Sequence, residues 1–434
     1  MVGERQKLPT VHEAWLPREH ALHRPRHGGR QLTALISALL FFVTPTMLWV
    51  FGVRPAEIEN HRLAGFPSLA SGWAFFTGLP TWATDQLSFR SGAIQAADGI
   101  SRGLFGESAP LDQGPPPAAG PIPGQSPPKD GTVPGQPSQP GAAGYQRVVQ
   151  GSDGWLYFGF DADAKCHPTR PLTETINKVN ELRKAVESSG RKFVFVVAPD
   201  KSTMVPQFLP SSYPGKECAQ AAEGPTWTGL VGQARSVDLR PELTASERRI
   251  GRPVYSSNDT HWRDEGSLVM TRGIADAIEP GVTRTWVSAP LKQYDLTADL
   301  PPLLGKQGVK TNTAYSLKPD GFVDRAGVAT NDIDVPDIRR ASPLVGTVDK
   351  RVLLLGDSFT KAASGYLPAA FTNLTMLAHS SNKIGLDATM NALVNSDVVV
   401  LEAVERNVSA GVVDFASDQF IQAAQAKLAA NPLR

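Results

Sequence analysis

The chain has 434 residues, of which 41% are hydrophobic and 20% are charged, and its formal net charge is +1. A length of this order predicts two to three domains. The near-zero charge excludes a strongly basic nucleic-acid-binding protein, and the apolar fraction excludes a wholly disordered chain. With only two cysteines, a small disulfide-dense fold is excluded as well.

The first predicted element is a membrane helix over residues 32–53. This run of 22 residues contains no charged side chain, and at about 1.5 Å per residue it is long enough to cross a hydrocarbon core of about 30 Å. The alternative is a buried helix of a soluble core, which seldom stays uncharged over such a length. We expect an uncleaved anchor rather than a signal peptide, because the run ends in large residues and not in a small-residue cleavage site.

The charges around this run predict its orientation. Residues 1–31 carry six Lys/Arg and three Glu, so the positive-inside rule places this tail in the cytoplasm and the rest of the chain outside. We therefore expect a single-pass protein of the cell membrane whose main domain is extracytoplasmic. The 381 residues after the run have a net charge of −2, which offers no global attraction for a polyanion.

Two further segments precede the main domain. Residues 54–107 hold enough aromatic and aliphatic residues for short helices and are predicted to form a membrane-proximal helical segment. Residues 108–145 form a predicted linker, because 110–144 contains 11 Pro and 7 Gly. Proline removes backbone donors and glycine raises the entropy cost of ordering, so an extended spacer is expected there. A proline-rich ligand for a recognition domain is the alternative.

Residues 146–434 have the pattern of an α/β domain. Apolar residues recur at helical spacing over 176–186, and three continuous apolar runs, at 193–198, 352–355 and 398–401, are typical of strands buried on both faces. A parallel sheet covered by helices is the most economical architecture for such a pattern.

Cys166 and Cys218 both fall in this domain, in polar and loop-like contexts. In an exported protein such a pair favours a disulfide over a metal site or a nucleophile.

Ser358 lies in a Gly-Asp-Ser sequence that directly follows the run at 352–355. Open α/β sheets bind ligands at the carboxyl ends of their strands. A small residue such as Gly356 permits the sharp turn that exposes a nucleophilic hydroxyl, and the following helix supplies backbone donors for an oxyanion. The alternative is an ordinary turn and helix cap.

Asp259 and His261 form an Asp-x-His pair that is able to activate such a serine. A serine hydroxyl needs a base, usually a histidine held by a carboxylate. In an extended segment, residues i and i+2 point to the same side. The alternatives are a surface loop with an Asx turn, or a pair of metal ligands, although no further His/Asp cluster is evident for a metal.

Together these motifs resemble the AlgJ/AlgX-like alginate O-acetyltransferase family, in which the Asp-x-His segment precedes the serine. The matching segments are GSDGWLYF (151–158), VVAPDKSTMVPQFLP (196–210), NDTHW (258–262), LLLGDSF (353–359) and VVVLEAVERN (398–407), with weaker matches at 59–69 and 85–94. The resemblance implies a three-layer α/β/α fold of the SGNH-hydrolase type with a parallel sheet. With 27 residues after Asn407, the chain looks more like the membrane-anchored branch of the family than like members with a carbohydrate-binding module.

The resemblance also implies a function and a set of roles. The protein would transfer acetyl groups to hydroxyls of an exported, alginate-like polysaccharide through an acetyl-serine intermediate. Ser358 would be the nucleophile, His261 the base and Asp259 its orienting carboxylate, with no cofactor or metal. The expected partners are the polysaccharide, the membrane and a multi-spanning acyltransferase of the MBOAT class as acetyl donor; nucleic acid is not expected. A carbohydrate O-acetyl esterase and a catalytically silent scaffold subunit are the alternatives.

Several other residues have weaker assignments. Asn382, after the strand-like segment 374–378, is a candidate for the oxyanion hole together with Gly356, and Trp262 is expected as a wall of the site or as core packing. Lys201 is expected as a solvated loop lysine, with contact to an acidic sugar as the alternative. Glu402 and Arg406 are expected as a helical ion pair, and His167 and His379 as structural or surface residues.

Overall fold

The computed structural model describes residues 15–17, 19–20, 29–51, 75–76, 82, 145–330, 332–379 and 385–433. The chain divides into two compact units, Met1–Glu57 with His61–Ala93 and Ile58–Asn60 with Ile94–Arg434. In the first unit, residues 32–50 of the predicted anchor lie in helix α1 (Gly29–Val50). Among the described residues, no helix has both the length and the apolar character required to span a bilayer. The predicted anchor is therefore not confirmed.

The second unit contains a six-stranded sheet in the order β4-β3-β10-β8-β9-β7. Its strands are β3 (Lys192–Ala198), β4 (Ser236–Asp238), β7 (Asp337–Arg340), β8 (Val348–Gly356), β9 (Phe371–Ala378) and β10 (Val398–Val404). The three predicted apolar runs are β3, β8 and β10, which are adjacent and parallel at the centre of the sheet. The fully parallel sheet that we expected is wrong at one edge, because β7 runs antiparallel to β9.

Helices cover both faces of this sheet, and the strand sequences explain why. Alternate side chains of β3 enter different cores. One core contains Val194, Val196 and Ala198, whereas the other contains Phe193 and Phe195. Because successive side chains point to opposite faces, only a continuous apolar run fills two cores. The predicted three-layer α/β/α arrangement is therefore present.

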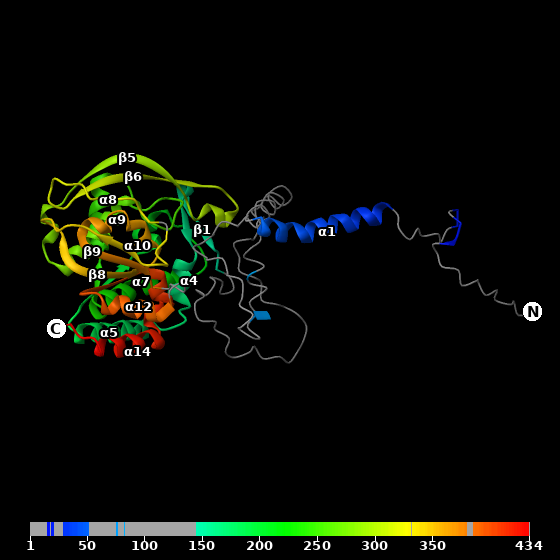
Figure 1. The fold of residues 1–434 in the computed structure, drawn as a ribbon. Coiled ribbons are helices and arrows are strands. Elements are labelled where there is room, and N and C mark those ends of the chain that lie inside the picture. The colour runs from blue at the N-terminus through cyan, green and yellow to red at the C-terminus, as the bar shows by residue number, and fades with distance from the viewer. Residues whose placement is uncertain are drawn as a thin grey trace, which may run out of the picture. The chain divides into compact units, whose positions relative to one another are not determined.

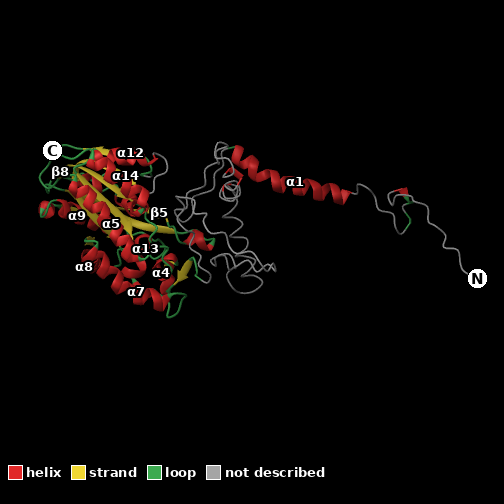
Figure 2. Cartoon of the chain, turned by 90° about the horizontal axis from the view of Figure 1, so that it is seen from below, coloured by secondary structure: helices red, strands yellow, loops and turns green. Residues whose placement is uncertain are grey.

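The two helical layers are distinct in the views of the domain. One consists of α5 (Leu172–Ser188), α12 (Gly385–Val394) and α14 (Asp418–Ala429), seen in front of the sheet in Figure 2. The other face is covered by α9 (Asp264–Ile278), α10 (Ser358–Ala363) and α11 (Leu367–Ala370). Further helices of the unit are α4 (Phe160–Cys166), α6 (Lys201–Met204), α7 (Lys216–Thr228), α8 (Arg240–Ile250) and α13 (Glu405–Ala410).

Two antiparallel pairs lie outside the central sheet. One joins β1 (Val148–Gln150) to β2 (Leu156–Phe158), and the other joins β5 (Val287–Thr297) to β6 (Val309–Lys318). The β5–β6 ribbon lies above α9, on the side of the domain opposite to α5 and α14 (Figure 1). Almost every residue of β5 is exposed, so its sequence carries none of the hydrophobic alternation that predicts a half-buried strand.

The disulfide is confirmed, since Cys166 at the end of α4 is bonded to Cys218 in α7 with their Cα atoms 5.8 Å apart. The predicted segment at 54–107 lies outside the described residues except for 75–76 and 82, and residues 108–144 of the predicted linker lie wholly outside them. Both of these assignments stay predictions.

Candidate active site

Ser358 lies where the sequence predicts, at the carboxyl end of a central parallel strand. β8 ends at Gly356, and α10 begins at Ser358. Asp357 caps the helix, because its carboxylate accepts the backbone N–H of Phe359 at 2.8 Å, and its second oxygen accepts that of Val404 at 2.8 Å. The turn is thus bonded to the neighbouring strand β10, and the partly exposed Ser358 hydroxyl has a fixed direction.

Gly356 is required by the packing beneath this turn. A Cβ atom at Gly356 would lie 1.9 Å from Oγ1 of Thr360 and 3.0 Å from Oε2 of Glu402. Such a contact is far inside van der Waals distance, so any side chain would push α10 away from the strand. The small residue that we expected before the serine therefore has a steric reason.

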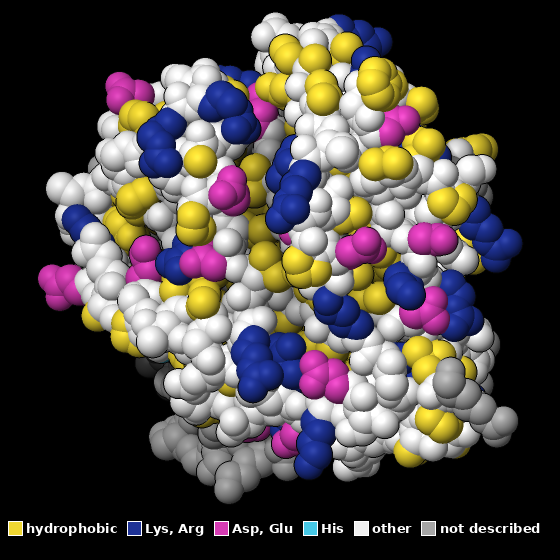
Figure 3. Space-filling view, turned by 90° about the vertical axis from the view of Figure 1, so that its left-hand side faces the viewer, with side chains coloured by type: hydrophobic (Ala, Val, Ile, Leu, Met, Phe, Trp, Pro, Cys, Tyr) yellow, Lys and Arg dark blue, Asp and Glu magenta, His cyan; other side chains and the backbone are white. Residues whose placement is uncertain are grey.

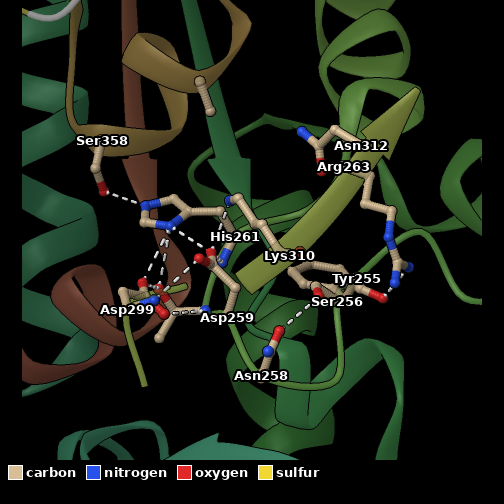
Figure 4. Close-up of polar contacts among 12 residues, drawn as sticks. Tyr255, Ser256, Asn258, Asp259, His261, Arg263, Asp299, Lys310, Asn312 and Ser358 are labelled. Carbon is tan, nitrogen blue, oxygen red and sulfur yellow. Dashed lines mark hydrogen bonds and ion pairs between the residues drawn. The ribbon is translucent and has the colours of Figure 1, made fainter. Parts of the chain in front are cut away.

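His261 lies between Ser358 and Asp259, as drawn in Figure 4. Its Nε2 is 2.8 Å from Oγ of Ser358, and its Nδ1 is 3.0 Å from Oδ1 of Asp259. The carboxylate of Asp259 also accepts the backbone N–H of His261 at 2.9 Å, which folds the Asp-x-His segment back on itself. The structure therefore brings together the three residues that the sequence predicts as nucleophile, base and orienter.

Asp299 is a second carboxylate at the histidine, and no sequence pattern indicates it. Its Oδ2 lies 3.2 Å from Nδ1 of His261, and its Oδ1 accepts the backbone N–H of Thr260 at 2.8 Å. Asp299 follows β5, 38 positions beyond His261 along the chain, in a segment with no recognisable motif. Its place beside His261 becomes evident only in the folded structure.

Lys310, on β6, completes the charges of the site. Its Nζ lies 2.9 Å from Oδ1 of Asp259, and both side chains are buried. Burial alone would raise the pKa of Asp259, but its bonds to His261 and Lys310 hold that pKa well below its usual range. Burial alone would lower the pKa of His261, but the hydrogen bonds and charges of Asp259 and Asp299 outweigh it and raise that pKa.

These residues also permit a comparison with the metal alternative. Asp259, His261 and Asp299 offer one ligand atom each within 4.8 Å of one another. Lys310, however, is in contact with the Asp259 oxygen that faces the imidazole, and a metal ion there would lie beside an ammonium group. The arrangement of donors and acceptors therefore fits an acid–base site better than a cation site.

The other candidates for the site have different outcomes. Trp262 is 1% exposed and packs edge-on against Phe359 with ring centroids 4.8 Å apart, so it is a core residue and offers almost no surface to a substrate. Asn382 lies outside the described residues, and its assignment to the oxyanion hole stays a prediction. His167 is an exposed residue paired with Asp163, whereas His379 is buried beside Phe415.

Two of the weaker expectations are wrong. Lys201 is not a solvated loop residue, because it is 1% exposed. Glu402 and Arg406 do not form a helical ion pair: Glu402 is still in β10, and its carboxyl accepts the hydroxyl of Thr360 at 2.8 Å. Arg406 instead pairs with Asp200 at 2.8 Å.

The face of the domain that carries the C-terminal end lies away from this site. Figure 3 shows the face that carries the C-terminal end, where Lys/Arg and Asp/Glu side chains alternate with hydrophobic ones and no histidine is visible. Leu433 bonds there to the carbonyl of Ser189, just before β3. Ser358 follows the carboxyl end of β8, which runs in the same direction as β3, so the site lies at the strand ends opposite to Ser189, where ligands of parallel α/β sheets bind.

Comparison with known proteins follows this geometry. A family model described as the SGNH hydrolase-like domain of the acetyltransferase AlgX matches residues 148–404, more than half of the chain. This chain belongs to that family. The matched range includes Ser358, His261 and Asp259, and it also includes Asp299 and Lys310.

A curated relative, the probable alginate O-acetylase AlgJ of Pseudomonas syringae pv. tomato, is 28% identical over 214 residues, which are 46% of this chain and 53% of the relative. The chain thus spans about half the length of that relative. Among solved structures, the O-acetyltransferase domain of Pseudomonas putida AlgJ has 18% identity and a TM-score of 0.43, covering 64% of this chain and 98% of that one. Pseudomonas aeruginosa AlgX has 15% identity and a TM-score of 0.41, covering 65% of each chain.

Proposed function

We propose that this protein is an O-acetyltransferase that modifies hydroxyl groups of an exported, alginate-like polysaccharide. The observation that carries the proposal is the continuous hydrogen-bonded series from Ser358 through His261 to Asp259, at the carboxyl end of β8. Membership of the AlgX acetyltransferase family supports the acetyl group as cargo. The polysaccharide acceptor rests on the name of the curated relative, a probable alginate O-acetylase.

The proposed reaction has two steps that share one base. Nε2 of His261 takes the proton of the Ser358 hydroxyl while Oγ attacks the carbonyl carbon of the donor's acetyl group, and the donor's leaving group departs with that proton. In the second step a sugar hydroxyl gives its proton to Nε2 and attacks the acetyl-serine. Oγ then leaves and recovers the proton, so the enzyme returns to its starting state.

Charge and burial favour this assignment of roles. The bond from Nδ1 to Asp259 selects the tautomer in which Nε2 has a free lone pair toward Ser358. Two carboxylates next to Nδ1 stabilise the imidazolium that forms in each step. Because Ser358 is the first residue of α10, its N–H has no acceptor within the helix and is a candidate donor for the oxyanion.

The proposed location is outside the cytoplasm, with the catalytic domain facing a membrane acyltransferase of the MBOAT class as donor. The Cys166–Cys218 disulfide supports an oxidising compartment. In intact cells, a membrane-impermeant protease added outside is expected to degrade the domain. Protection of the domain until the cells are lysed would contradict this location.

Acetyl transfer by the purified full-length chain tests the function itself. With a chromogenic acetyl ester as donor and an oligosaccharide as acceptor, we expect acetylated oligosaccharide, and an acetyl group on the peptide that contains Ser358 after rapid quenching. Release of acetate without transfer would favour an esterase, and neither reaction would favour a scaffold. Ser358→Ala is expected to abolish both transfer and labelling, and full activity in this variant would overturn the mechanism.

A further inference from the structure

Lys201 is a buried lysine that the proposed reaction does not use. It begins α6 directly after β3, and its side chain lies beneath the segment that carries Asp259 and His261. We propose that Lys201 is a positioning residue, whose ammonium group holds residues 256–259 in the conformation that aligns Asp259 with His261. This inference rests on the proposed function, since it assigns a role in the alignment of that site.

The hydrogen bonds that Lys201 donates go to the main chain of this segment. Its Nζ donates to the backbone carbonyls of Ser256 at 3.1 Å, Ser257 at 3.3 Å and Asp259 at 2.8 Å. An ammonium group has three N–H donors, so one is available for each carbonyl. The backbone of residues 256–259, of which Figure 4 labels Ser256, Asn258 and Asp259, therefore directs three carbonyl groups at Nζ of Lys201.

Without this ammonium the segment would lose the donor on which its carbonyl groups converge. Of the three carbonyl oxygens, that of Ser257 would keep the N–H of Leu156 as a donor, but those of Ser256 and Asp259 would lose theirs, and unsatisfied buried acceptors are destabilising. The segment would relax by turning those carbonyls away. Because the carbonyl of Asp259 is one of the three, such a turn would also move the carboxylate that orients His261.

The β1–β2 hairpin fixes the same segment from the other side. The N–H of Leu156 donates to the carbonyl of Ser257 at 2.7 Å. The rings of Trp155 and Tyr157 lie 5.8 Å and 5.2 Å from Nζ of Lys201, close enough for a favourable cation–π contact. The GSDGWLYF and VVAPDK sequences are far apart in the chain, and this arrangement gives both of them a common task at the site.

The charges that face Lys201 set the pH range in which it holds the segment. Burial, with a smaller contribution from Lys310, lowers its pKa to about 7 despite the opposing carboxylates of Asp299, Asp259 and Asp161. A neutral amine has only two N–H donors for three carbonyls. We therefore expect the alignment of Asp259 with His261 to weaken as the pH rises through about 7. This loss adds an alkaline limb to the profile of activity against pH.

Three variants of the full-length chain test this role. Lys201→Met removes the donors while keeping the length of the side chain, and Lys201→Arg keeps a charge that is not lost at any working pH. Lys192→Met is the matched control: Lys192 begins the same strand β3 at its other end, and its Nζ donates to the carbonyl of Ile278 at 2.6 Å. Acetyl transfer is measured as kcat and KM from pH 5 to 10, and backbone hydrogen exchange over residues 255–262.

For Lys201→Met we expect kcat to fall on the order of 100-fold, the loss typical of a misplaced catalytic group, with little change in KM and with faster hydrogen exchange at 255–262. Lys201→Arg is expected to recover part of kcat and to shift the alkaline limb to higher pH. Lys192→Met should match the wild type in all three measurements. Wild-type kcat and exchange in Lys201→Met, or an unchanged alkaline limb in Lys201→Arg, would overturn the inference.

The two proposals fail in distinguishable ways. If the wild type transfers no acetyl group, the proposed function is wrong, but faster exchange at 255–262 in Lys201→Met still supports the hold on this segment. If the wild type is active and Lys201→Met has normal exchange, only the role of Lys201 is wrong. Should Lys201→Met fail to fold, the pH profile and exchange of Lys201→Arg decide the matter.

Discussion

At the scale of single residues, the candidate site is an imidazole with the hydroxyl of Ser358 on one side and two carboxylates on the other. Asp259 is held by His261, by Lys310 and by the backbone N–H of Asp299, which reaches its second oxygen at 3.2 Å. Lys310 offsets one of the two negative charges, so Asp299 supplies the excess that favours the imidazolium. Asp259 therefore supplies the orientation, whereas both carboxylates raise the pKa of His261 and the charge of Asp299 is the one that Lys310 does not offset.

The pH dependence of activity tests this division between the carboxylates. His261 must be neutral to act as a base, so kcat/KM rises as the pH increases through its pKa. Because Asp299 raises that pKa, Asp299→Asn is expected to move the acid limb of the kcat/KM profile to lower pH with a modest effect on kcat. Asp259→Asn, in contrast, is expected to lower kcat strongly, because the tautomer is no longer fixed.

Asp295→Asn is the control for the Asp299 variant. Asp295 is in β5 on the same ribbon, but its carboxylate accepts the hydroxyl of Thr311 at 2.7 Å on the exposed surface. Its replacement should leave the acid limb where it is in the wild type. An acid limb that stays fixed in Asp299→Asn, or that moves to higher pH, would show that Asp299 has no influence on the imidazole.

Glu402 is a buried carboxyl under the turn between β8 and α10 that carries Ser358. Its Oε2 accepts the backbone N–H of Asp357 at 3.1 Å and the hydroxyl of Thr360 at 2.8 Å. Burial, and then the carboxylate of Asp357, raise its pKa well above the usual range. The folded protein therefore keeps a proton on Glu402 that the unfolded chain releases above its ordinary pKa, so this group makes folding less favourable as the pH rises.

Glu402→Gln removes that pH dependence while keeping an oxygen acceptor of the same shape. We expect the melting temperature of the variant, relative to that of the wild type, to increase steadily from pH 5 to pH 8. Glu402→Ala leaves the two donors without an acceptor and is expected to be less stable than the wild type by about 1–3 kcal/mol. A difference between Glu402→Gln and the wild type that stays constant with pH would mean that Glu402 is ionised in the folded protein.

At the scale of elements, the junction of β8 and α10 depends on close packing. Gly356→Ala would place a methyl group 2.6 Å from Cβ of Thr360, and relief of such overpacking typically costs about 1–3 kcal/mol. We expect this loss in chemical denaturation, together with a large loss of activity because α10 carries Ser358. The matched control is Gly232→Ala in the helical turn Gly229–Gln233, where a new Cβ meets nothing within 4 Å, so little change in stability is expected. Equal stabilities of the two variants would contradict the packing argument.

The elements also show which parts of the site the sequence is able to predict. The apolar runs of β3, β8 and β10 place Ser358 at a strand end, and the spacing of Asp259 and His261 is local, so both follow from the sequence. Lys201 does not, because a charged residue after a strand is usually solvated, and only the converging carbonyls reveal its burial. The position of Glu402 is not predicted either. β10 continues through Glu402, fully buried, before the chain becomes helical, so Glu402 is not on a helix with Arg406.

Long-range placement is the second limit on prediction. Asp299 follows the exposed strand β5, and Lys310 lies in β6, where buried positions such as Lys310 and Asn312 are polar. Neither the ribbon nor its approach to His261 is therefore encoded in a local hydrophobic pattern. The antiparallel edge strand β7 is hard to predict for the same reason, because its four residues are half-buried or exposed. Central elements, whose sequences must fill two cores, are therefore predictable, whereas added edges and ribbons are not.

At the scale of the whole domain, the Cys166–Cys218 disulfide joins α4 to α7 and closes a loop with a sequence separation of 52 residues. That loop contains β3, the first strand of the central sheet, and α6 with Lys201. A cross-link of this length lowers the entropy of the unfolded chain, which corresponds to about 4 kcal/mol in the chain-entropy model. The bond thus stabilises the part of the fold on which the Asp259 segment rests.

We expect the double variant Cys166→Ala, Cys218→Ala to be less stable than the oxidised wild type by up to about 4 kcal/mol, measured by denaturant unfolding of the purified protein. Reducing agent should lower the stability of the wild type toward that of the variant and should leave the variant unchanged, because the variant has no cysteine left to reduce. Because the disulfide acts mainly by lowering the entropy of the unfolded chain, the folded variant should keep its activity at low temperature. A wild type that is equally stable with and without reductant would show that this cross-link does not constrain the unfolded chain.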